Sequence, residues 1–402
     1  MKESKNPKTG AGALAGLKVL DFTSLLPGPY ATLCLADLGA EVLKIASPSR
    51  LDLVDLLAPH LPESGMSSAS AYLNRGKRSL ALNLKHPRAV EVVGRLVSAY
   101  DIVVESFRPG VMARLGLGYE ALAALNPAVI YCSLSGYGQT GPWRDRAGHD
   151  INYLALSGHI SYSGRKEGGP TLTGIQVADL TAGAGNTVTA ILAAVIARYR
   201  TGTGQYIDIA MSDGMMAFTA LQGAVYLAGG EEPKREESHL NGGSLYDFYE
   251  TQDGGYVAVG CLEPQFFGNF CETLGRPDLA AGGILPPDTA RVKEELRAIF
   301  RTRTRDAWAE IFRDVDACVD PVLTLAEALG SDQAGTRGMA AKVPSPDGGL
   351  LLQPANPLHL SATPPRYDAP APAPGQHTRE VLEGLGYDPE EMDELGKTGL
   401  FD

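Results

Sequence analysis

The sequence predicts an α/β protein, with a large domain built on a parallel β-sheet and a smaller α+β domain after it. The first observation is the order strand, turn, helix, strand at the start of the chain, which is typical of a parallel sheet. The second is a change of pattern after residue 225, where a charged loop precedes alternating apolar residues. The third is the length of 402 residues, which favours two domains over one.

The large domain, residues 1–225, contains alternating strand-like and helix-like segments. A helix is expected from about Tyr30, in the segments PRAVEVVGRLVSAY and YEALAALN, and over 179–200, with a further strand in QYIDIAMSDG. The other strands are expected at 17–23, 41–45, 79–84, 101–107 and 128–134. The first turn has PGP at 27–29 instead of the GxGxxG fingerprint, which argues against a nicotinamide dinucleotide site.

The small domain is expected over residues 226–330. The segment YDFYETQDGGYVAVGC alternates like a β-hairpin with its turn at Asp253 and Gly254. Its helices are expected at 265–274, 291–300 and 304–313. Residues 331–402 form a C-terminal segment, in which the proline-rich stretch 362–375 is an extended connector before a helical pattern.

Composition and charge exclude several classes of function. A net charge of −12 argues against a general binder of nucleic acids or anionic membranes, because both partners attract basic surfaces. No run approaches the roughly 20 consecutive apolar residues of a membrane span, so no membrane association is expected. The N-terminal segment lacks the apolar core of a secretory signal. Five scattered cysteines favour reduced thiols over disulfides or a zinc site, and the expected location is the cytoplasm.

Histidine and acidic residues stand at three expected helix starts, which makes them candidates for catalysis. His149 and Asp150 follow Gly148, and Asp150 is expected to be the N-cap of a helix. Asp179 opens a second helix, and Glu263 precedes the proline that begins a third. If His149 and Asp179 face one pocket, they could add a proton to one face of a carbon and remove it from the other. The alternative is that the acids only cap helices and that His149 is a surface residue.

Basic residues cluster in two loops of this acidic protein. Arg75, Lys77 and Arg78 lie in NRGKRS, and Arg108 and Arg114 lie in SFRPGVMARLGLG. Such clusters between strands suggest a phosphate-bearing ligand, because guanidinium groups donate forked hydrogen bonds to phosphate. The alternative is that these residues only add solubilising charge to the loops.

These motifs together resemble the family III coenzyme A transferases, and within them the α-methylacyl-CoA racemase branch. The resemblance extends over LKVLDFTSLLPGPYATLCLADLGAEVLKI, NRGKRSLALNLK, ESFRPGVMARLGLGYE, SLSGYGQTGP, RTGTGQYIDIAM, DACVDPVL and GQHTREVLEGLGY. It implies a Rossmann-like large domain to which residues 331–402 return, a small domain, and an interlocked homodimer. It also implies an acyl-CoA thioester substrate that brings its own CoA, with no separate cofactor and no metal.

The resemblance also implies roles for the candidate residues. In a racemase of this family, the residues matching His149 and Asp179 are the two bases on opposite faces of the α-carbon. The residue matching Glu263 supports the histidine, and the N–H of Asp150 holds the thioester oxygen as it gains enolate charge. The expected reaction is inversion of the α-carbon of a 2-methyl-branched acyl-CoA through an enolate.

A family III CoA-transferase is the alternative reading of the same residues. There the aspartate matching Asp179 is a nucleophile that forms an acyl anhydride and then a CoA thioester. Two features are closer to this branch: DLTAGAG has no run of glycines after Asp179, and the segment between LKIASP and NRGKRS is longer than in racemases. Ser47 stands where the family often has arginine. His149, which matches the second base of the racemases, favours the racemase over the transferase. The presence of His149, Asp179 and Glu263 together argues against a CoA-binding protein without activity.

Overall fold

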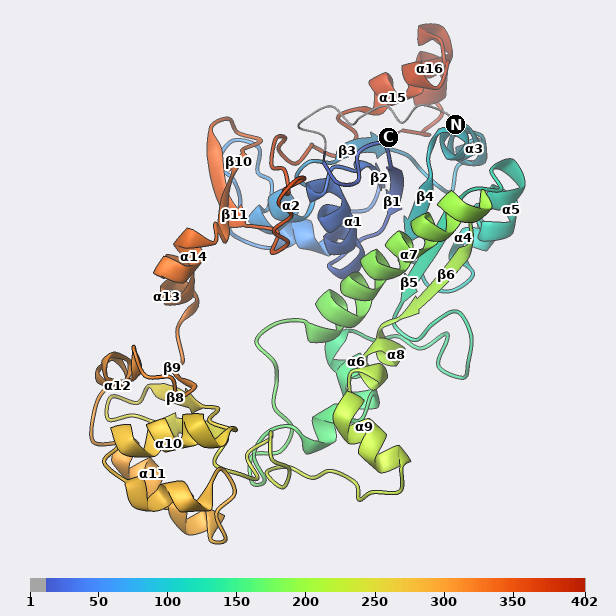
Figure 1. Cartoon of the computed structure of the whole chain (residues 1–402). Coiled ribbons are helices and arrows are strands. Elements are labelled where there is room, and N and C mark those ends of the chain that lie inside the picture. The colour runs from blue at the N-terminus through green and yellow to red at the C-terminus, as the bar shows by residue number, and fades with distance from the viewer. Residues whose placement is uncertain (1–11, 402) are drawn as a thin grey trace. The chain divides into compact units, whose positions relative to one another are not determined.

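The computed structural model describes residues 12–401, which divide into two compact units (Figure 1). Within those residues, unit 1 comprises 12–156, 175–215 and 333–401. Unit 2 comprises the rest, 157–174 and 216–332.

The predicted domain limits differ from these units in detail. The expected small domain, residues 226–330, lies inside unit 2, which also includes the segment 157–174 from the middle of the expected large domain. The expected C-terminal segment belongs to unit 1 from residue 333 onwards.

Unit 1 is built on a six-stranded sheet in the order β3-β2-β1-β4-β5-β6, with every pair of neighbours parallel. The α/β class with a parallel sheet is therefore confirmed, and the strand order is that of a Rossmann fold. The strands are β1 (Lys18–Phe22), β2 (Glu41–Ala46), β3 (Arg78–Ala81), β4 (Ile102–Glu105), β5 (Ile130–Ser135) and β6 (Tyr206–Ala210).

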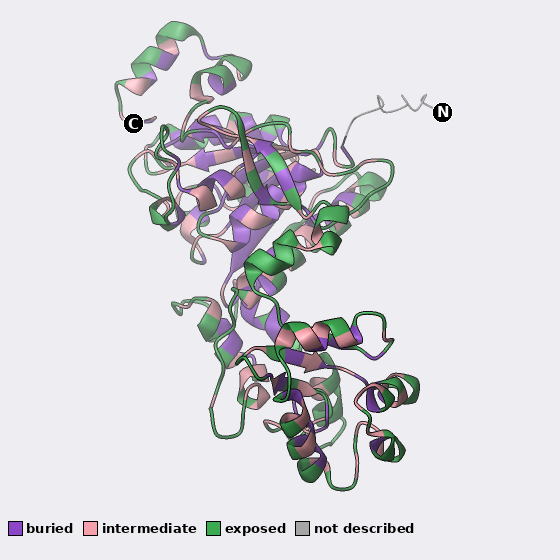
Figure 2. Cartoon of the chain, turned by 90° about the vertical axis from the view of Figure 1, so that its left-hand side faces the viewer, coloured by how far each residue is buried: buried purple, intermediate pink, exposed green. Residues whose placement is uncertain are grey.

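Alternate residues of these strands face two hydrophobic cores, so both faces of the sheet are buried (Figure 2). Along β1, Val19 faces a core shared with Leu35 and Ile191, while Leu20 faces a core shared with Val93 and Leu382. Leu35 lies in α1 (Pro27–Asp37) and Ile191 in α7 (Asn186–Thr201), so these two helices cover one face of the sheet. The opposite face is covered by α3 (Ala89–Ala99), α5 (Tyr119–Leu125), α15 (Thr378–Gly384) and α16 (Pro389–Gly396).

The remaining elements of unit 1 are short. They are η1 (Leu53–Leu56), α2 (Ser68–Leu73), α4 (Val111–Arg114), α6 (Asp150–Leu156), α8 (Met211–Ala217, which ends in unit 2), α14 (Asp332–Thr336, which begins in unit 2), and the antiparallel pair β10 (Ala340–Pro344) and β11 (Leu350–Pro354). The proline-rich stretch 362–375 has neither helix nor strand, as predicted, and leads into α15. That connector carries the chain back to the sheet, because the amide of His377 donates to the carbonyl oxygen of Ser79 at 2.9 Å.

The helix expected over 179–200 is present but not uniform. It begins as a π-helix, η3 (Ala178–Gly185), and continues as α7. Together they form a helical run of 24 residues, Ala178–Thr201, that is long and apolar enough to cross a membrane by length and composition alone. Threonine, asparagine and glycine interrupt the apolar residues of this helical run, so it contains no stretch of about 20 consecutive apolar residues. In unit 1, Ile191 and Val195 of this run pack against the sheet.

Unit 2 has its own core around a three-stranded antiparallel sheet in the order β7-β8-β9. The predicted hairpin is confirmed, with Gly254 in its turn at a φ of 76°. The three helices expected in this region are also present, as α10, α11 and α12. The elements of unit 2 are η2 (His159–Tyr162), α9 (Ala220–Leu227), β7 (Asp247–Glu250), β8 (Tyr256–Val259), α10 (Pro264–Thr273), η4 (Pro277–Gly282), α11 (Thr289–Phe300), α12 (Arg305–Phe312), β9 (Val319–Pro321) and α13 (Leu325–Gly330).

Candidate functional site

The strand order of unit 1 reverses between β1 and β4, and ligands of such sheets bind beyond the carboxyl ends of the strands at this point. The loops that follow β1 and β4 meet there, because the amide of Ser24 donates to Oγ of Ser106 at 3.1 Å. Arg108 lies two residues further on and is exposed, and its side chain has no hydrogen bond or ion pair within residues 12–401. A free guanidinium at this edge of the sheet suits an anionic ligand.

Arg114 lies close to Arg144, an arginine that was not among the predicted site residues. A Cβ atom built on Gly110 would lie 3.2 Å from a terminal nitrogen of Arg114 and 3.4 Å from one of Arg144. Both arginine side chains are exposed, and Gly110 has a φ of 78°, a conformation that favours glycine. Arg144 stands in a polar loop well outside the quoted basic motifs, so only the fold reveals that it joins this group.

Arg75 does not present its guanidinium to a ligand, which corrects the expectation that it contacts phosphate. The residue is 1% exposed, and it donates to both carboxylate oxygens of Asp37 at 3.0 and 2.8 Å. It also donates to Oε1 of Gln353 and to the carbonyl oxygen of Pro354, so it joins α1 to β11. A buried arginine needs partners of this kind, and these take up its donors.

The expectation that Lys77 contacts phosphate is corrected as well, because Lys77 is also buried and bonded inside unit 1. Its Nζ atom is buried and donates to Asp21 at 3.1 Å and to Thr32 at 2.8 Å. Burial lowers the pKa of Lys77 to about 8, against the opposing effect of the Asp21 charge. Arg78 is half-buried and is paired on the surface with Glu41 and Glu380 at 3.5 and 3.0 Å. The predicted basic residues thus fall into two groups. Those of NRGKRS are paired within unit 1, with Arg75 and Lys77 buried and Arg78 at the surface, whereas Arg108 and Arg114 near β4 are exposed.

His149 lies at the start of α6, and its backbone closes the first turn of that helix. Its carbonyl oxygen accepts from the amides of Asn152 and Tyr153, so His149 takes the N-cap position that was expected for Asp150. The predicted N-cap position was one residue too late, because Asp150 is already the first residue of the helix. The imidazole is exposed.

The glycine before His149 is required by close packing. A Cβ atom on Gly148 would lie 2.7 Å from the hydroxyl oxygen of Tyr137 and 2.8 Å from the ring of Tyr153. The hydroxyl of Tyr153 donates to the carbonyl oxygen of Gly148 at 2.5 Å, and the two tyrosine rings meet edge to face at 5.2 Å. These contacts fix the backbone that leads into His149.

Asp150 and Asp179 are in direct contact. The backbone amide of Asp179 donates to Oδ1 of Asp150 at 3.0 Å, and this bond ties the start of α6 to the start of η3. Burial, together with the negative charge of Asp150, raises the pKa of the Asp179 carboxyl to about 6. Asp179 is therefore not an N-cap, which was the alternative reading, since its own amide is bonded and Val177 precedes the helix.

Small residues allow η3 to pack closely on its neighbours. A Cβ atom on Gly183 would lie 3.1 Å from both Pro27 in α1 and Met211 in α8. The sequence TAGAG after Asp179 therefore fits a close approach between helices, and this packing supports the Asp179 backbone. A π-helix is uncommon and is found often at functional sites.

Glu263 lies in unit 2 as the N-cap residue of α10. Its carboxyl is exposed and makes no capping hydrogen bond to the helix. The expected support of His149 by Glu263 involves two different units and stays a prediction.

Unit 1 therefore combines three features that bear on chemistry. It has a carboxyl group with a raised pKa at Asp179, an exposed imidazole at His149, and a group of exposed arginines at Arg108, Arg114 and Arg144. Among residues 12–401, no group of three histidine, cysteine or acidic side chains is placed to hold a metal ion. Such a set suits a reaction of a phosphate-bearing substrate in which a carboxylate acts as base or nucleophile.

A sequence model described as CoA-transferase family III matches residues 14–378. The chain belongs to CoA-transferase family III. The crystal structure of a CAIB/BAIF family protein from Brucella suis is similar to this family III chain, with a TM-score of 0.79 and 31% identity. The match covers 93% of this chain and 100% of the Brucella suis chain.

Relatives of this family III enzyme differ in the reaction that their names state. Alpha-methylacyl-CoA racemase of Homo sapiens is 36% identical over 393 residues, which cover 97% of this chain and 98% of that protein. Succinate–glutarate CoA-transferase of Agrobacterium fabrum is 36% identical over 386 residues, which cover 92% and 95%. Succinyl-CoA:glutarate CoA-transferase of Homo sapiens is 34% identical over 398 residues, with 97% and 90% covered. Racemases and transferases thus resemble this enzyme to a similar degree.

Proposed function

We propose that this enzyme is an acyl-CoA racemase that inverts the α-carbon of a 2-methyl-branched acyl-CoA. The observation that carries the proposal is the hydrogen bond between the Asp179 amide and the Asp150 carboxylate. Because His149 directly precedes Asp150, this bond brings the backbone of a histidine close to that of an acid whose pKa is raised to about 6. A racemase needs two bases of this kind, whereas a transferase needs only the acid.

The reaction consists of two proton transfers and needs no oxidant or reductant. Asp179 or His149 takes the α-proton from one face, and the electron pair of the C–H bond becomes that of an enolate. The other base then returns a proton to the opposite face, so a hydrogen is exchanged and the configuration is inverted. Asp150 is the first residue of α6, so its N–H has no partner within that helix and can donate to the enolate oxygen. Losing such a donor costs on the order of 3 kcal/mol in better-studied oxyanion holes.

The phosphates of the CoA portion are assigned to the exposed arginines Arg108, Arg114 and Arg144. Their support is the position of Arg108 beyond β4 and the approach of the other two at Gly110. Arg75 and Lys77 are left out of this assignment, because their donors are used inside unit 1.

A matched pair of measurements tests the reaction. A single enantiomer of a 2-methylacyl-CoA is incubated with the enzyme in deuterated water, and α-deuterium and optical purity are followed together. The expected result is α-deuterium in the product, with both enantiomers formed. In parallel, the enzyme is mixed with the same substrate and hydroxylamine, and Asp179 is examined for an acyl or thioester adduct. An adduct on Asp179, with no α-deuterium in the product, would refute the proposal that the enzyme is a racemase.

A family III CoA-transferase is the second candidate, and the 36% identity to succinate–glutarate CoA-transferase favours it. In that reaction, a carboxylate oxygen of Asp179 attacks the thioester carbonyl and expels CoA thiolate, which leaves an acyl anhydride. The thiolate then attacks the aspartyl carbonyl, releases the first acid and leaves an aspartyl-CoA thioester. A second carboxylate accepts CoA by the reverse of these steps, so the hydroxylamine adduct identifies this branch.

The assembly and location follow as further proposals. An interlocked homodimer is supported by α9, which exposes Leu221, Val225 and Leu227, since exposed apolar surface of this kind often marks an interface. We assign the enzyme to the cytoplasm, with no cofactor beyond the CoA of its substrate and no membrane or nucleic-acid partner.

A further inference from the structure

A short segment of unit 1 exposes its apolar side chains to solvent. Residues 51–57, here called the leucine segment, follow β2 and include η1. Its four leucines are between 53% and 70% exposed, and they are Leu51, Leu53, Leu56 and Leu57. Val54 is the one residue of the segment that is buried. Four exposed leucines within seven residues make an apolar surface, and surfaces of this kind often mark a binding site.

The acidic residues of the leucine segment are bonded to the protein instead. Both carboxylate oxygens of Asp52 accept from the amide of Leu25, at 3.1 and 3.0 Å. The carboxylate of Asp55 accepts from the hydroxyl of Ser70 at 2.5 Å and from the amide of Asp52 at 3.2 Å. On an ordinary surface helix the leucines would be buried and the aspartates would meet water. Hydrogen bonds thus hold this segment in place and leave its leucines available to a ligand.

The leucine segment is attached to a loop that packs beside the helix of Asp179. Leu25, which Asp52 holds, lies in the loop after β1 at the carboxyl edge of the sheet. Its φ of 64° is strained for a leucine, and strain of this kind is common at functional sites. Two residues later Pro27 begins α1, and a Cβ atom on Gly183 would lie 3.1 Å from it. Gly183 lies four residues after Asp179 in η3, so the loop contacts the helix of the proposed base.

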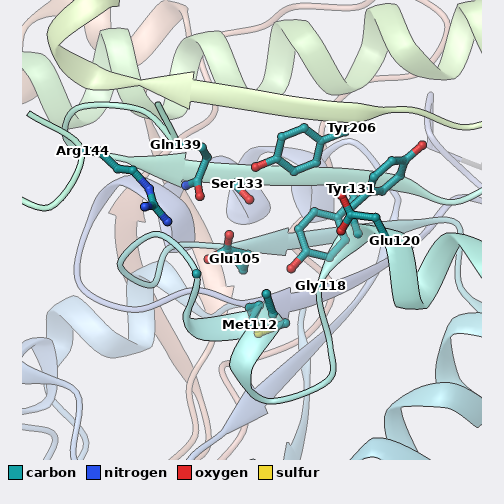
Figure 3. Close-up of a pocket in the computed structure, with 12 residues that line it drawn as sticks. Glu105, Met112, Gly118, Glu120, Tyr131, Ser133, Gln139, Arg144 and Tyr206 are labelled. Carbon is teal, nitrogen blue, oxygen red and sulfur yellow. The ribbon is translucent and has the colours of Figure 1, made fainter. Parts of the chain in front are cut away.

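A cavity elsewhere in unit 1 does not suit an apolar chain. It measures about 240 Å³ and is bordered by β4, β5 and β6 (Figure 3). Glu105, Gln139 and Arg144 are among the residues that line it, and the Nε2 atom of Gln139 is buried without a hydrogen bond within residues 12–401. An apolar chain would leave such polar groups without partners, which is unfavourable. The apolar part of a ligand is therefore better placed on the leucine segment.

We propose that the leucine segment binds the acyl chain of the substrate and selects acyl groups that are apolar beyond the α-carbon. The selection rests on the proposed function, in which an acyl-CoA presents its α-carbon to Asp179. Residues 51–57 contain no basic side chain, so a second carboxylate, such as that of a succinyl or glutaryl group, would find no cation within the segment. Arg50, just before the segment, is the cation that would have to serve such a group.

The binding of CoA thioethers by calorimetry tests this proposal. The probes are CoA itself and its S-ethyl, S-butyl, S-hexyl and S-octyl thioethers, which lack the thioester carbonyl and so undergo neither racemisation nor CoA transfer. Full burial of a methylene group raises affinity about fourfold, so a chain that lies on an open surface should gain about twofold per methylene. The S-(5-carboxypentyl) thioether, which has the same number of carbons as the S-hexyl probe, should bind about tenfold more weakly than that probe.

The double variant Leu53→Ser, Leu56→Ser should lose most of the gain per methylene and bind CoA itself as the wild type does. Both leucines are more than half exposed, so the fold should be kept, and CoA binding confirms this. Leu51→Ser alone is a milder change that should reduce the gain in part. Leu125→Ser is the matched control, because Leu125 is 57% exposed at the end of α5, outside the leucine segment, and its loss should leave the gain unchanged.

Three results would overturn the proposal. They are an affinity in the wild type that does not depend on chain length, a gain per methylene that the double variant and Leu51→Ser both keep, and tighter binding of the carboxylated probe, which would point to Arg50. The mass of each variant in sedimentation is measured as well. If the double variant changes the mass of the assembly and keeps the gain, the leucines form a subunit contact and the proposal is wrong.

Failure of the proposed function is recognised separately. The thioethers do not react, so their binding is measured in the same way whether or not α-deuterium exchange is found. If CoA binds but chain length has no effect, the selection by the leucine segment alone is wrong. If neither CoA nor any thioether binds at millimolar concentration, the assignment of an acyl-CoA substrate is wrong, and the selection is wrong with it.

Discussion

Replacing Asp179 with asparagine should abolish turnover and at the same time stabilise the protein above pH 6. The pKa of this carboxyl is raised from its ordinary 3.8 to about 6, first by burial and then by the charge of Asp150. The folded state therefore binds a proton more tightly than the unfolded chain does, and ionising Asp179 opposes folding. This cost is absent below about pH 4, where both states are protonated, and is complete above about pH 6.

The size of the effect follows from the pKa values. A rise from 3.8 to about 6 corresponds to about 3 kcal/mol at 1.36 kcal/mol per pH unit. Because Asp179 is only partly buried, solvent screening reduces this to about 1–2 kcal/mol. Asparagine has nearly the same shape and no charge, so its variant should be more stable by that amount at pH 8 and by almost nothing at pH 4.

Urea denaturation of wild type and variant across pH 4–8 measures this difference. Asp145→Asn is the matched control, because it removes a carboxylate that is 80% exposed and should give no pH-dependent gain. A constant difference between Asp179→Asn and wild type at every pH would refute the reasoning, and so would a variant less stable than wild type at pH 8.

Four further substitutions test the roles assigned to single residues. His149→Ala should abolish racemisation but leave partial α-deuterium exchange from one face. Loss of exchange from both faces would contradict the assignment of His149 and Asp179 to opposite faces of the α-carbon. Asp150→Asn keeps the oxygen that accepts from the amide but removes the charge, so the acidic limb of the pH–kcat/KM profile should move to lower pH. Arg108→Ala should raise KM about tenfold for every acyl-CoA alike with kcat unchanged, whereas Arg200→Ala, at an exposed arginine of α7, should not. Arg75→Ala should lower the free energy of unfolding by about 3–5 kcal/mol in urea denaturation, because it leaves a buried carboxylate unpaired.

Most elements of the fold could be predicted because their signals are local. Apolar runs of strand length alternate with helical periodicity in the first half of the chain, and Asp253-Gly254 marks a hairpin turn. The π-helix at Ala178–Gly185 could not be predicted, since alanine and glycine do not specify which of two helical hydrogen-bond patterns forms. Its cause lies in close contacts with α1 and α8, which the chain reaches only after folding.

The difference between local signals and tertiary contacts also explains why the candidate site could be predicted only in part. The sequence contains the residue types for phosphate binding, but it does not show which arginines are already paired. Asp37 and Gln353, the partners of Arg75, are 38 and 278 residues away in the chain. Arg144 had no local signal, since it reaches Arg114 only through the loop that follows β5. Which cations stay free for a ligand is therefore a property of tertiary contacts.

With Asp179 as the proposed base or nucleophile, the contact between Asp150 and Asp179 is compatible with either branch of the family. The Asp150 carboxylate holds the backbone of Asp179 and, through its charge, raises the pKa of that side chain. A carboxylate with a higher pKa is a stronger base for an α-proton, and it is also a stronger nucleophile towards a thioester carbonyl. The acid alone therefore does not choose between proton transfer and acyl transfer. The choice depends on a second base on the opposite face of the α-carbon, and in this chain the residue next to Asp150 is a histidine whose backbone is fixed by Gly148 and two tyrosine rings.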